Sequence, residues 1–137
     1  MIKMIVFLKR KAGMSAQEFR DRYESGHAML AKKLFGDIFA AYARNYVTEL
    51  VLTPTVEGGG ATAFDYDVFA EVEFDSRAGF EEWVRRCGEP AIQTLLVQDE
   101  HTLFDRDSIL TFLCDEVREN SRPVRDPMGD ERATQVR

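Results

Sequence analysis

Runs of alternating and helically spaced apolar residues predict four strands and two interrupted helices along this chain of 137 residues. The first run, residues 2–9, places Met4 and Val6 on one face and Ile5 and Phe7 on the other. A strand that is apolar on both faces belongs in the centre of a covered sheet. Further strands are predicted over 42–52, 64–74 and 108–115, and helical spacing appears over 15–35 and 76–96.

The first helical stretch has a clear start and an internal interruption. Ser15 and Glu18 form a capping box, in which each side chain satisfies a backbone N–H at the helix start. The pair Ser25-Gly26 predicts a break before the helical pattern resumes. His27 lies at that break, and its ordinary pKa of about 6.5 would allow either protonation state near neutrality. Spacing alone leaves two interpretations open: a capping or surface histidine, or a functional one.

The middle of the chain combines a polar strand, a glycine-rich connection and a strongly alternating strand. The polar content of 42–52 predicts an edge strand. The glycines Gly58-Gly59-Gly60 lack the Lys-Ser/Thr of a phosphate-binding loop, so they predict only a flexible connection. Residues 64–74 alternate between an apolar face and an acidic face. The acidic face is either solvated or, if a second sheet covers it, the lining of a cavity.

The order strand, helix, strand, strand, helix, strand predicts an α+β fold, the ferredoxin-like split βαβ arrangement with a four-stranded antiparallel sheet. Helices cover only one face of such a sheet, so the apolar face of Phe7 needs another cover, and two sheets packed as a homodimer would supply it. We expect one domain over 1–117. Residues 118–137, with five arginines and four acids, predict a charged tail that is mobile or laid on the partner subunit.

Charge and cysteine content narrow the class of partner. A net charge of −6 without a basic stripe argues against nucleic acid and anionic membranes as partners. The first apolar run is too short to span a bilayer and does not resemble an export signal. Cys87 and Cys114 lack metal-ligand spacing and predict buried free thiols. Together these features predict a cytoplasmic protein whose partner is a small molecule or another protein.

Several short motifs give the chain a resemblance to the EthD family. They comprise the stretch 1–15, Glu18-Phe-Arg-Asp-Arg-Tyr-Glu followed by His27-Ala28, Tyr42 with Asn45, Ala70-Glu71 before Phe74-Asp75, and Asp99-Glu100 before Phe104-Asp105. The family often has His-His-Ala-Pro where this chain has Gly26-His27-Ala28-Met29, so one histidine and the proline are absent. The resemblance implies a homodimeric α/β barrel with a pocket in each subunit.

The family resemblance implies a pocket for a hydrophobic, oxygenated small molecule of polyketide-like or aromatic character. The enzyme hypothesis is a dehydratase-, cyclase- or decarboxylase-like reaction without a cofactor or metal, in which His27 is the general acid or base and Glu71 orients it. The expected substrate-binding residues are Tyr23, Tyr42, Asn45, Asp67, Phe7 and Phe69. Three alternatives remain: a non-catalytic binding or accessory protein of a degradation pathway, an oxidoreductase such as a monooxygenase, and a haem- or metal-binding relative that uses His27.

Overall fold

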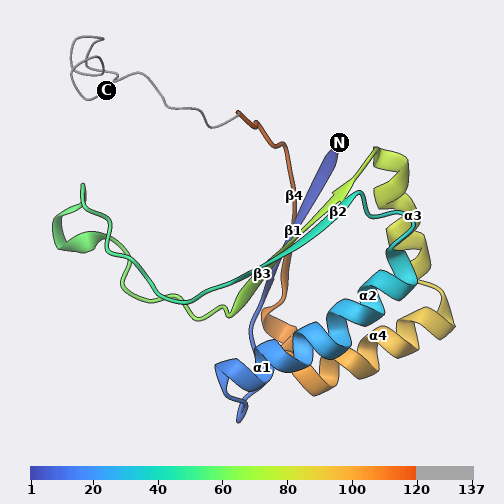
Figure 1. Cartoon of the computed structure of the whole chain (residues 1–137), viewed down its shortest axis with the longest axis horizontal. Helices are drawn as coiled ribbons and strands as arrows, with labels where there is room; N and C mark the ends of the chain where they lie inside the picture. Colours follow the sequence, from blue (N-terminus) through green and yellow to red (C-terminus); the bar gives the residue numbers. More distant parts are fainter. Residues whose placement is uncertain (120–137) are drawn as a thin grey trace, which may run out of the picture.

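The computed structural model describes residues 1–119, in which helices cover one face of a four-stranded sheet (Figure 1). The strands are β1 (Ile2–Leu8), β2 (Ala41–Tyr46), β3 (Val68–Phe74) and β4 (Leu110–Cys114). The helices are α1 (Ala16–Arg22), the π-helix η1 (Tyr23–His27), α2 (Ala28–Phe35), α3 (Arg77–Cys87) and α4 (Pro90–Leu103). Two short 3₁₀ turns, η2 (Glu57–Gly59) and η3 (Arg106–Ser108), lie in connections. The charged tail predicted over 118–137 lies outside the described residues beyond Glu119.

The sheet has the order β2-β3-β1-β4, and all neighbouring strands are antiparallel. This is the ferredoxin-like topology that the element order predicts, with β1 central and β2 at an edge. In the register, Val6 lies between Ala70 of β3 and Thr111 of β4, while Phe7 lies between Phe69 and Leu110. Because side chains alternate along a strand, Val6 and Phe7 face opposite sides of the sheet.

The core lies between the sheet and the helices. Phe19, Tyr23 and Phe104 pack with Val68 in one cluster, and a second cluster is formed around Phe74 with Met4 and Val72. Phe19 is 1% exposed, and burying a phenyl ring of this kind contributes roughly 3 kcal/mol or more to stability. The core therefore fixes α1, η1 and α4 against the same part of the sheet.

The predicted break at Ser25-Gly26 is instead a single turn of π-helix within a continuous helical segment. Both neighbours of η1 keep helical backbone angles, and the N–H of Ala28 bonds to the carbonyl of Tyr23, five residues earlier. A π-turn accommodates one extra residue between two α-helices that remain in register on the core. The π-turn bears on the placement of His27, which is its last residue.

Other predicted boundaries also need correction. The strands predicted over 42–52 and 64–74 pair only over Ala41–Tyr46 and Val68–Phe74, since the chain between them leaves the sheet. The last strand covers Leu110–Cys114 rather than 108–115. Residues 99–103, expected as a polar joint, form the final turns of α4, whose C-cap is Phe104. The polar side chains of residues 99–103 face water or, in the case of Asp99, contact His27. A run of polar residues therefore did not indicate the end of the helix.

The sheet face turned away from the helices, which we call the open face, carries both aromatic and charged side chains. Phe7 contacts Phe69 and Phe112 with ring centroids 5.8 and 6.1 Å apart, and Phe112 is 48% exposed. Lys3, on the same face, forms ion pairs with Glu71, Glu73 and Glu116. No helix within residues 1–119 is long and apolar enough to cross a membrane.

Candidate functional site

A cavity of about 360 Å³ lies between the sheet and the helices. β1 and β3 contribute its floor through side chains such as Val6 and Ala70. The helical side contributes His27, Phe104 and Trp83, and the lining as a whole is mostly apolar. A space of this size and character suits a small hydrophobic molecule held by a few polar groups.

His27 is the polar side chain that the π-turn aims into this cavity. Its ring packs edge-on against Tyr23 and Phe104, with centroids 4.8 and 4.9 Å apart. Its Nδ1 lies 2.5 Å from Oδ2 of Asp99 on α4, and the His27 side chain is 16% exposed. Two aromatic walls and one carboxylate therefore fix the orientation of the imidazole.

The contact with Asp99 decides which ring nitrogen is available for chemistry. Because an ionised carboxylate only accepts hydrogen bonds, the proton of the neutral ring is on Nδ1 of His27, and this N–H donates the hydrogen bond to Asp99. The neutral ring then holds its lone pair on Nε2, and Asp99 stabilises the imidazolium when Nε2 gains a proton. The pair has the geometry of a general base held by an orienting carboxylate.

Two tyrosine hydroxyls provide further polar atoms at the cavity. The hydroxyl oxygens of Tyr23 and Tyr42 lie 3.1 Å apart. Burial raises the pKa of both phenols, and that of Tyr23 is raised furthest. Each of the two hydroxyls can donate or accept in this hydrogen bond. Tyr23 is 1% exposed and Tyr42 is half-buried, so Tyr42 is the more accessible of the two to a bound molecule.

An ion pair beside the cavity supports the second tyrosine. The guanidinium of Arg44 lies 4.7 Å from the centroid of the Tyr42 ring and donates two hydrogen bonds to Glu24, at 3.0 and 2.6 Å. The hydroxyl of Tyr46 donates to the same carboxylate at 2.5 Å. Hydrogen bonding by Arg44 lowers the pKa of Glu24 to about 2, so this carboxylate is charged throughout the neutral range.

Four of the predicted site residues lie on the open face, away from the cavity. Glu71 is bonded to Lys3 and Asn45, and Asn45 also donates to the backbone of Phe69. The expected pairing of Glu71 with His27 is wrong, because Glu71 lies on the side of β3 opposite to Ala70, which lines the cavity. Phe7 and Phe69 share the open face with it.

Of the predicted site residues, the structure gathers His27, Tyr23 and Tyr42 at one cavity. Asp67 lies outside it, where its carboxylate accepts a hydrogen bond from the backbone N–H of Arg10 at 2.8 Å. The partner that sequence reasoning missed is Asp99. The signal available was the Asp99-Glu100 motif, but a joint was expected there rather than a helix facing His27.

The structure also bears on the predictions for the two cysteines and for a metal site. Cys87 and Cys114 are free thiols, as predicted, but both are half-buried rather than buried. Cys87 lines the cavity, and burial raises the pKa of its thiol to about 11. Within residues 1–119, no three His, Cys, Asp or Glu side chains converge as a metal-binding group.

Comparison with known proteins gives one family match. The EthD domain model matches residues 11–107. A search of curated proteins found no match.

Solved structures with the same fold are distant in sequence. An EthD family protein from Bacillus halodurans has 14% identity and a TM-score of 0.57, with 85% of this chain and 99% of that chain covered. The protein At3g17210 from Arabidopsis thaliana has 16% identity and a TM-score of 0.56, with coverages of 88% and 100%. A dimeric protein of unknown function from Bacteroides fragilis, described as ferredoxin-like, has 10% identity and a TM-score of 0.52, with coverages of 84% and 95%. At these identities, the likeness establishes the fold.

Proposed function

The chain belongs to the EthD family, and on that premise we propose that it is an enzyme acting on a hydrophobic, oxygenated small molecule by proton transfer. The observation that carries the proposal is the His27–Asp99 pair at the wall of an apolar cavity. An imidazole oriented by a carboxylate at a mostly apolar cavity is suited to general acid–base catalysis.

The proposed reaction begins with a carbonyl compound in the cavity. Nε2 of His27 takes a proton from the carbon next to the carbonyl, and the electron pair of that C–H bond moves toward the carbonyl oxygen. The O–H of Tyr42 donates a hydrogen bond to the oxygen as negative charge develops. Asp99 stabilises the imidazolium. Return of the proton to another carbon gives isomerisation, and its transfer to a hydroxyl on the neighbouring carbon, which leaves as water, gives dehydration. In a cyclisation, the enolate carbon instead bonds to a second carbonyl carbon of the same molecule, and the proton goes to the alkoxide that forms there. None of these steps uses a cofactor.

The experiment has two stages. Native mass spectrometry of the purified protein first identifies any molecule that co-purifies in the cavity. The protein is then incubated in D₂O with 2-tetralone, an aromatic ketone, and deuterium uptake next to the carbonyl is followed by mass spectrometry. Catalysed uptake that is lost in His27→Gln supports the proposal, because glutamine keeps a hydrogen-bonding side chain but cannot exchange protons near neutrality.

The competing proposal is a non-catalytic binding protein, for which the mostly apolar lining of the cavity is the supporting observation. Binding without catalysis predicts that a co-purified ligand remains chemically unchanged. It also predicts that His27→Gln changes the affinity for the ligand, and that neither the wild type nor the variant converts the ligand. Unchanged 2-tetralone, together with an unchanged co-purified ligand, would favour this function over the enzyme.

We further propose that the working form is a homodimer. The open face carries Phe7, Phe69 and Phe112 with no helix covering it among the described residues. The similar protein from Bacteroides fragilis is described as dimeric. Packing two open faces together would remove these aromatic rings from water.

A further inference from the structure

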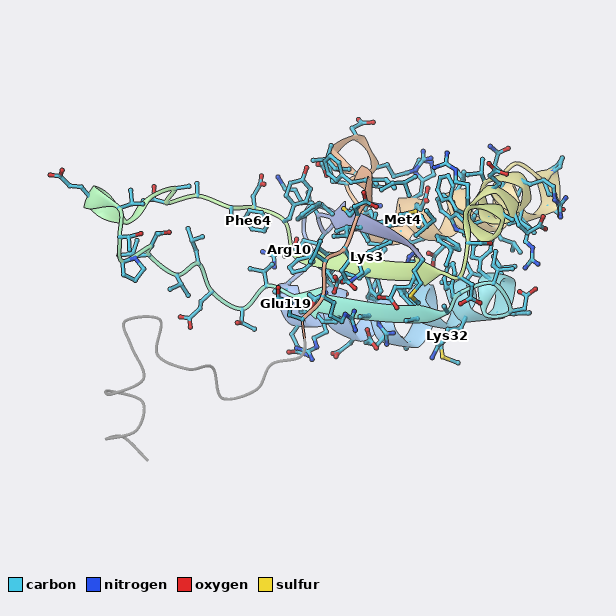
Figure 2. The ribbon with its side chains drawn as sticks, turned by 90° about the horizontal axis from the view of Figure 1, so that it is seen from above. Lys3, Met4, Arg10, Lys32, Phe64 and Glu119 are labelled. Atoms are coloured by element: carbon cyan, nitrogen blue, oxygen red, sulfur yellow. The ribbon has the colours of Figure 1, made fainter. Side chains whose placement is uncertain are left out.

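The connection between β2 and β3, residues 47–67, projects far from the rest of the structure, and we call it the β2–β3 arm (Figure 1). Connections in compact domains usually have about 4–6 residues, and much longer ones commonly have a role of their own. Figure 2 shows Phe64 on the arm, beyond the point near Arg10 where the chain leaves the sheet. The arm exposes six large apolar side chains: Val47, Leu50, Val51, Leu52, Val56 and Phe64.

The tip of the arm has a defined conformation of its own. The backbone N–H of Thr53 donates to Gly59 at 2.7 Å, and that of Gly59 donates to Val56 at 2.8 Å. Gly59 has φ +82°, and a Cβ there would lie 2.7 Å from the Leu52 side chain. This position therefore requires glycine. A tip that is already ordered loses less conformational entropy on binding than an extended coil does.

The root of the arm is also fixed. Lys9 pairs with Asp65 at 2.7 Å, and the Arg10 guanidinium pairs with Asp67 at 3.3 Å. The hydroxyl of Tyr66 donates to the backbone carbonyl of Ser108 at 2.8 Å. These contacts hold the direction in which the arm leaves the sheet.

That direction is toward the space in front of the open face. In Figure 1 the arm runs to the side of the sheet opposite to the helices. Phe64 of the arm contacts Phe7 of the open face, with ring centroids 6.5 Å apart, so the two apolar surfaces are continuous. An out-and-back segment of this length reaches at most about 35 Å, whereas packed sheets lie about 10 Å apart. The arm is long enough to reach past a sheet packed on the open face.

We propose that the β2–β3 arm of each copy packs along the body of a second copy of this chain. The inference rests on the proposed homodimer and adds a second contact region to it. Continuity with the open face favours the same occupant for both surfaces. The arm carries Glu49, Glu57, Asp65 and Asp67 and no basic residue, which disfavours an anionic membrane or nucleic acid as the occupant. Two-fold symmetry would form each arm contact twice.

The first test compares matched apolar-to-polar variants. Sedimentation equilibrium gives the dimer dissociation constant of the full chain and of the double variant Leu50→Ser/Val51→Ser. We expect at least a tenfold increase. The control is Val84→Ser/Leu95→Ser on α3 and α4, where the side chains are 49% and 46% exposed and no arm contact is proposed. We expect the control to leave the dissociation constant unchanged.

The second test locates the arm directly. Photo-reactive benzoylphenylalanine replaces Val56 near the tip, and illumination is followed by peptide mass spectrometry on a mixture of isotopically light and heavy protein. Light-to-heavy crosslinks are expected.

The outcomes distinguish the two proposals. A monomeric wild-type protein would overturn the homodimer and the arm contact together. A dimer that keeps its affinity in the arm variant, or that crosslinks only within single chains, would overturn the arm contact and leave the homodimer in place.

Discussion

Nδ1 of His27 lies 2.5 Å from Oδ2 of Asp99, a contact that joins the π-turn after α1 to α4. The two residues are 72 positions apart in sequence. His27 lines the cavity, and Asp99 contacts its imidazole from α4. Phe104 ends α4 and also packs on the imidazole, with ring centroids 4.9 Å apart. The helix that supplies the carboxylate therefore also supplies a wall for the ring.

Replacing Asp99 tests whether the pair acts as a unit. In Asp99→Asn the amide can donate to Nδ1, which favours the tautomer with its lone pair on the wrong nitrogen. We expect turnover to fall by roughly 100-fold to 10,000-fold, with ligand affinity nearly unchanged. Steady-state kinetics and calorimetric binding measure the two quantities. Glu81→Gln, an exposed acid on α3, is the control, and an equal effect of both changes would contradict the assigned role of Asp99.

Replacing each tyrosine separately tests the direction of their hydrogen bond. Tyr42→Phe removes the hydroxyl offered to the bound molecule, and we expect turnover to fall by about 100-fold. Tyr23→Phe removes the buried hydroxyl that hydrogen-bonds to Tyr42, so we expect a smaller loss of turnover and a stability loss of about 1 kcal/mol. Kinetics and thermal unfolding distinguish the two. A larger kinetic effect from Tyr23→Phe would show that Tyr23 is the hydroxyl that contacts the ligand.

The fold could be predicted from the sequence because the hydrophobic patterns that define its strands and helices are local in the chain. Strand alternation in 2–9 identifies a central strand with two apolar faces, and the element order then selects the ferredoxin-like topology. Boundaries were less accurate where local signals conflicted. The alternation around Phe64 continues past the end of the sheet, and Ser25-Gly26 has the composition of a break although the surrounding core keeps the chain helical.

The site was predicted only in part, for a related reason. His27 was selected by its position at the predicted break, and His27, Tyr23 and Tyr42 all belong to motifs that carry the resemblance to the EthD family. The partner of His27 could not be identified this way, because choosing between Glu71 and Asp99 requires knowing which side of β3 faces the helices and how α4 crosses it. Glu71 belongs to the face opposite to Ala70, and that assignment excludes it from the cavity.

The pair of Glu24 and Arg44 predicts a loss of stability in acid. The pKa of Glu24 is about 2 in the folded chain against an ordinary 4.5, so only the unfolded chain binds a proton between these values. Stability from this group is therefore fully present above about pH 4.5 and is lost as the pH falls toward 2. Since the Glu24 side chain is 39% exposed, solvent screening limits the contribution to about 1 kcal/mol.

Thermal unfolding of Glu24→Gln across this range provides the measurement. The variant is expected to melt below wild type at pH 7 and to match it near pH 2. Glu57→Gln, at the exposed tip of the β2–β3 arm, is the control. A gap between Glu24→Gln and wild type that stayed constant down to pH 2 would mean that packing, rather than charge, explains the effect.

The thiol of Cys87 offers a chemical probe of the cavity. Burial raises its pKa to about 11, so little thiolate is present at pH 8.5, and we expect alkylation by iodoacetamide to be about 100-fold slower than for a free cysteine. Peptide mass spectrometry follows the rate at this position. Unfolding in urea should restore the ordinary rate, and a cavity ligand should slow it further. Rapid alkylation in the folded protein would show that Cys87 is open to water.

The open face provides the last prediction, which concerns assembly. Phe7 lies among Phe69 and Phe112 at the centre of the surface proposed to meet a second copy. In Phe7→Asp, two carboxylates would enter an apolar contact related by two-fold symmetry, where each is costly to bury. We expect the dimer dissociation constant to rise by at least about 30-fold, as for an interface hot spot of about 2 kcal/mol.

Light scattering across a concentration series measures this change. Met29→Asp on α2 is the matched control, because Met29 is 54% exposed and lies on the helical side of the molecule. Circular dichroism checks that both variants remain folded. If Phe7→Asp is folded and dimerises as tightly as Met29→Asp, the two copies do not meet through the open face. The aromatic cluster around Phe7 would then need a different cover.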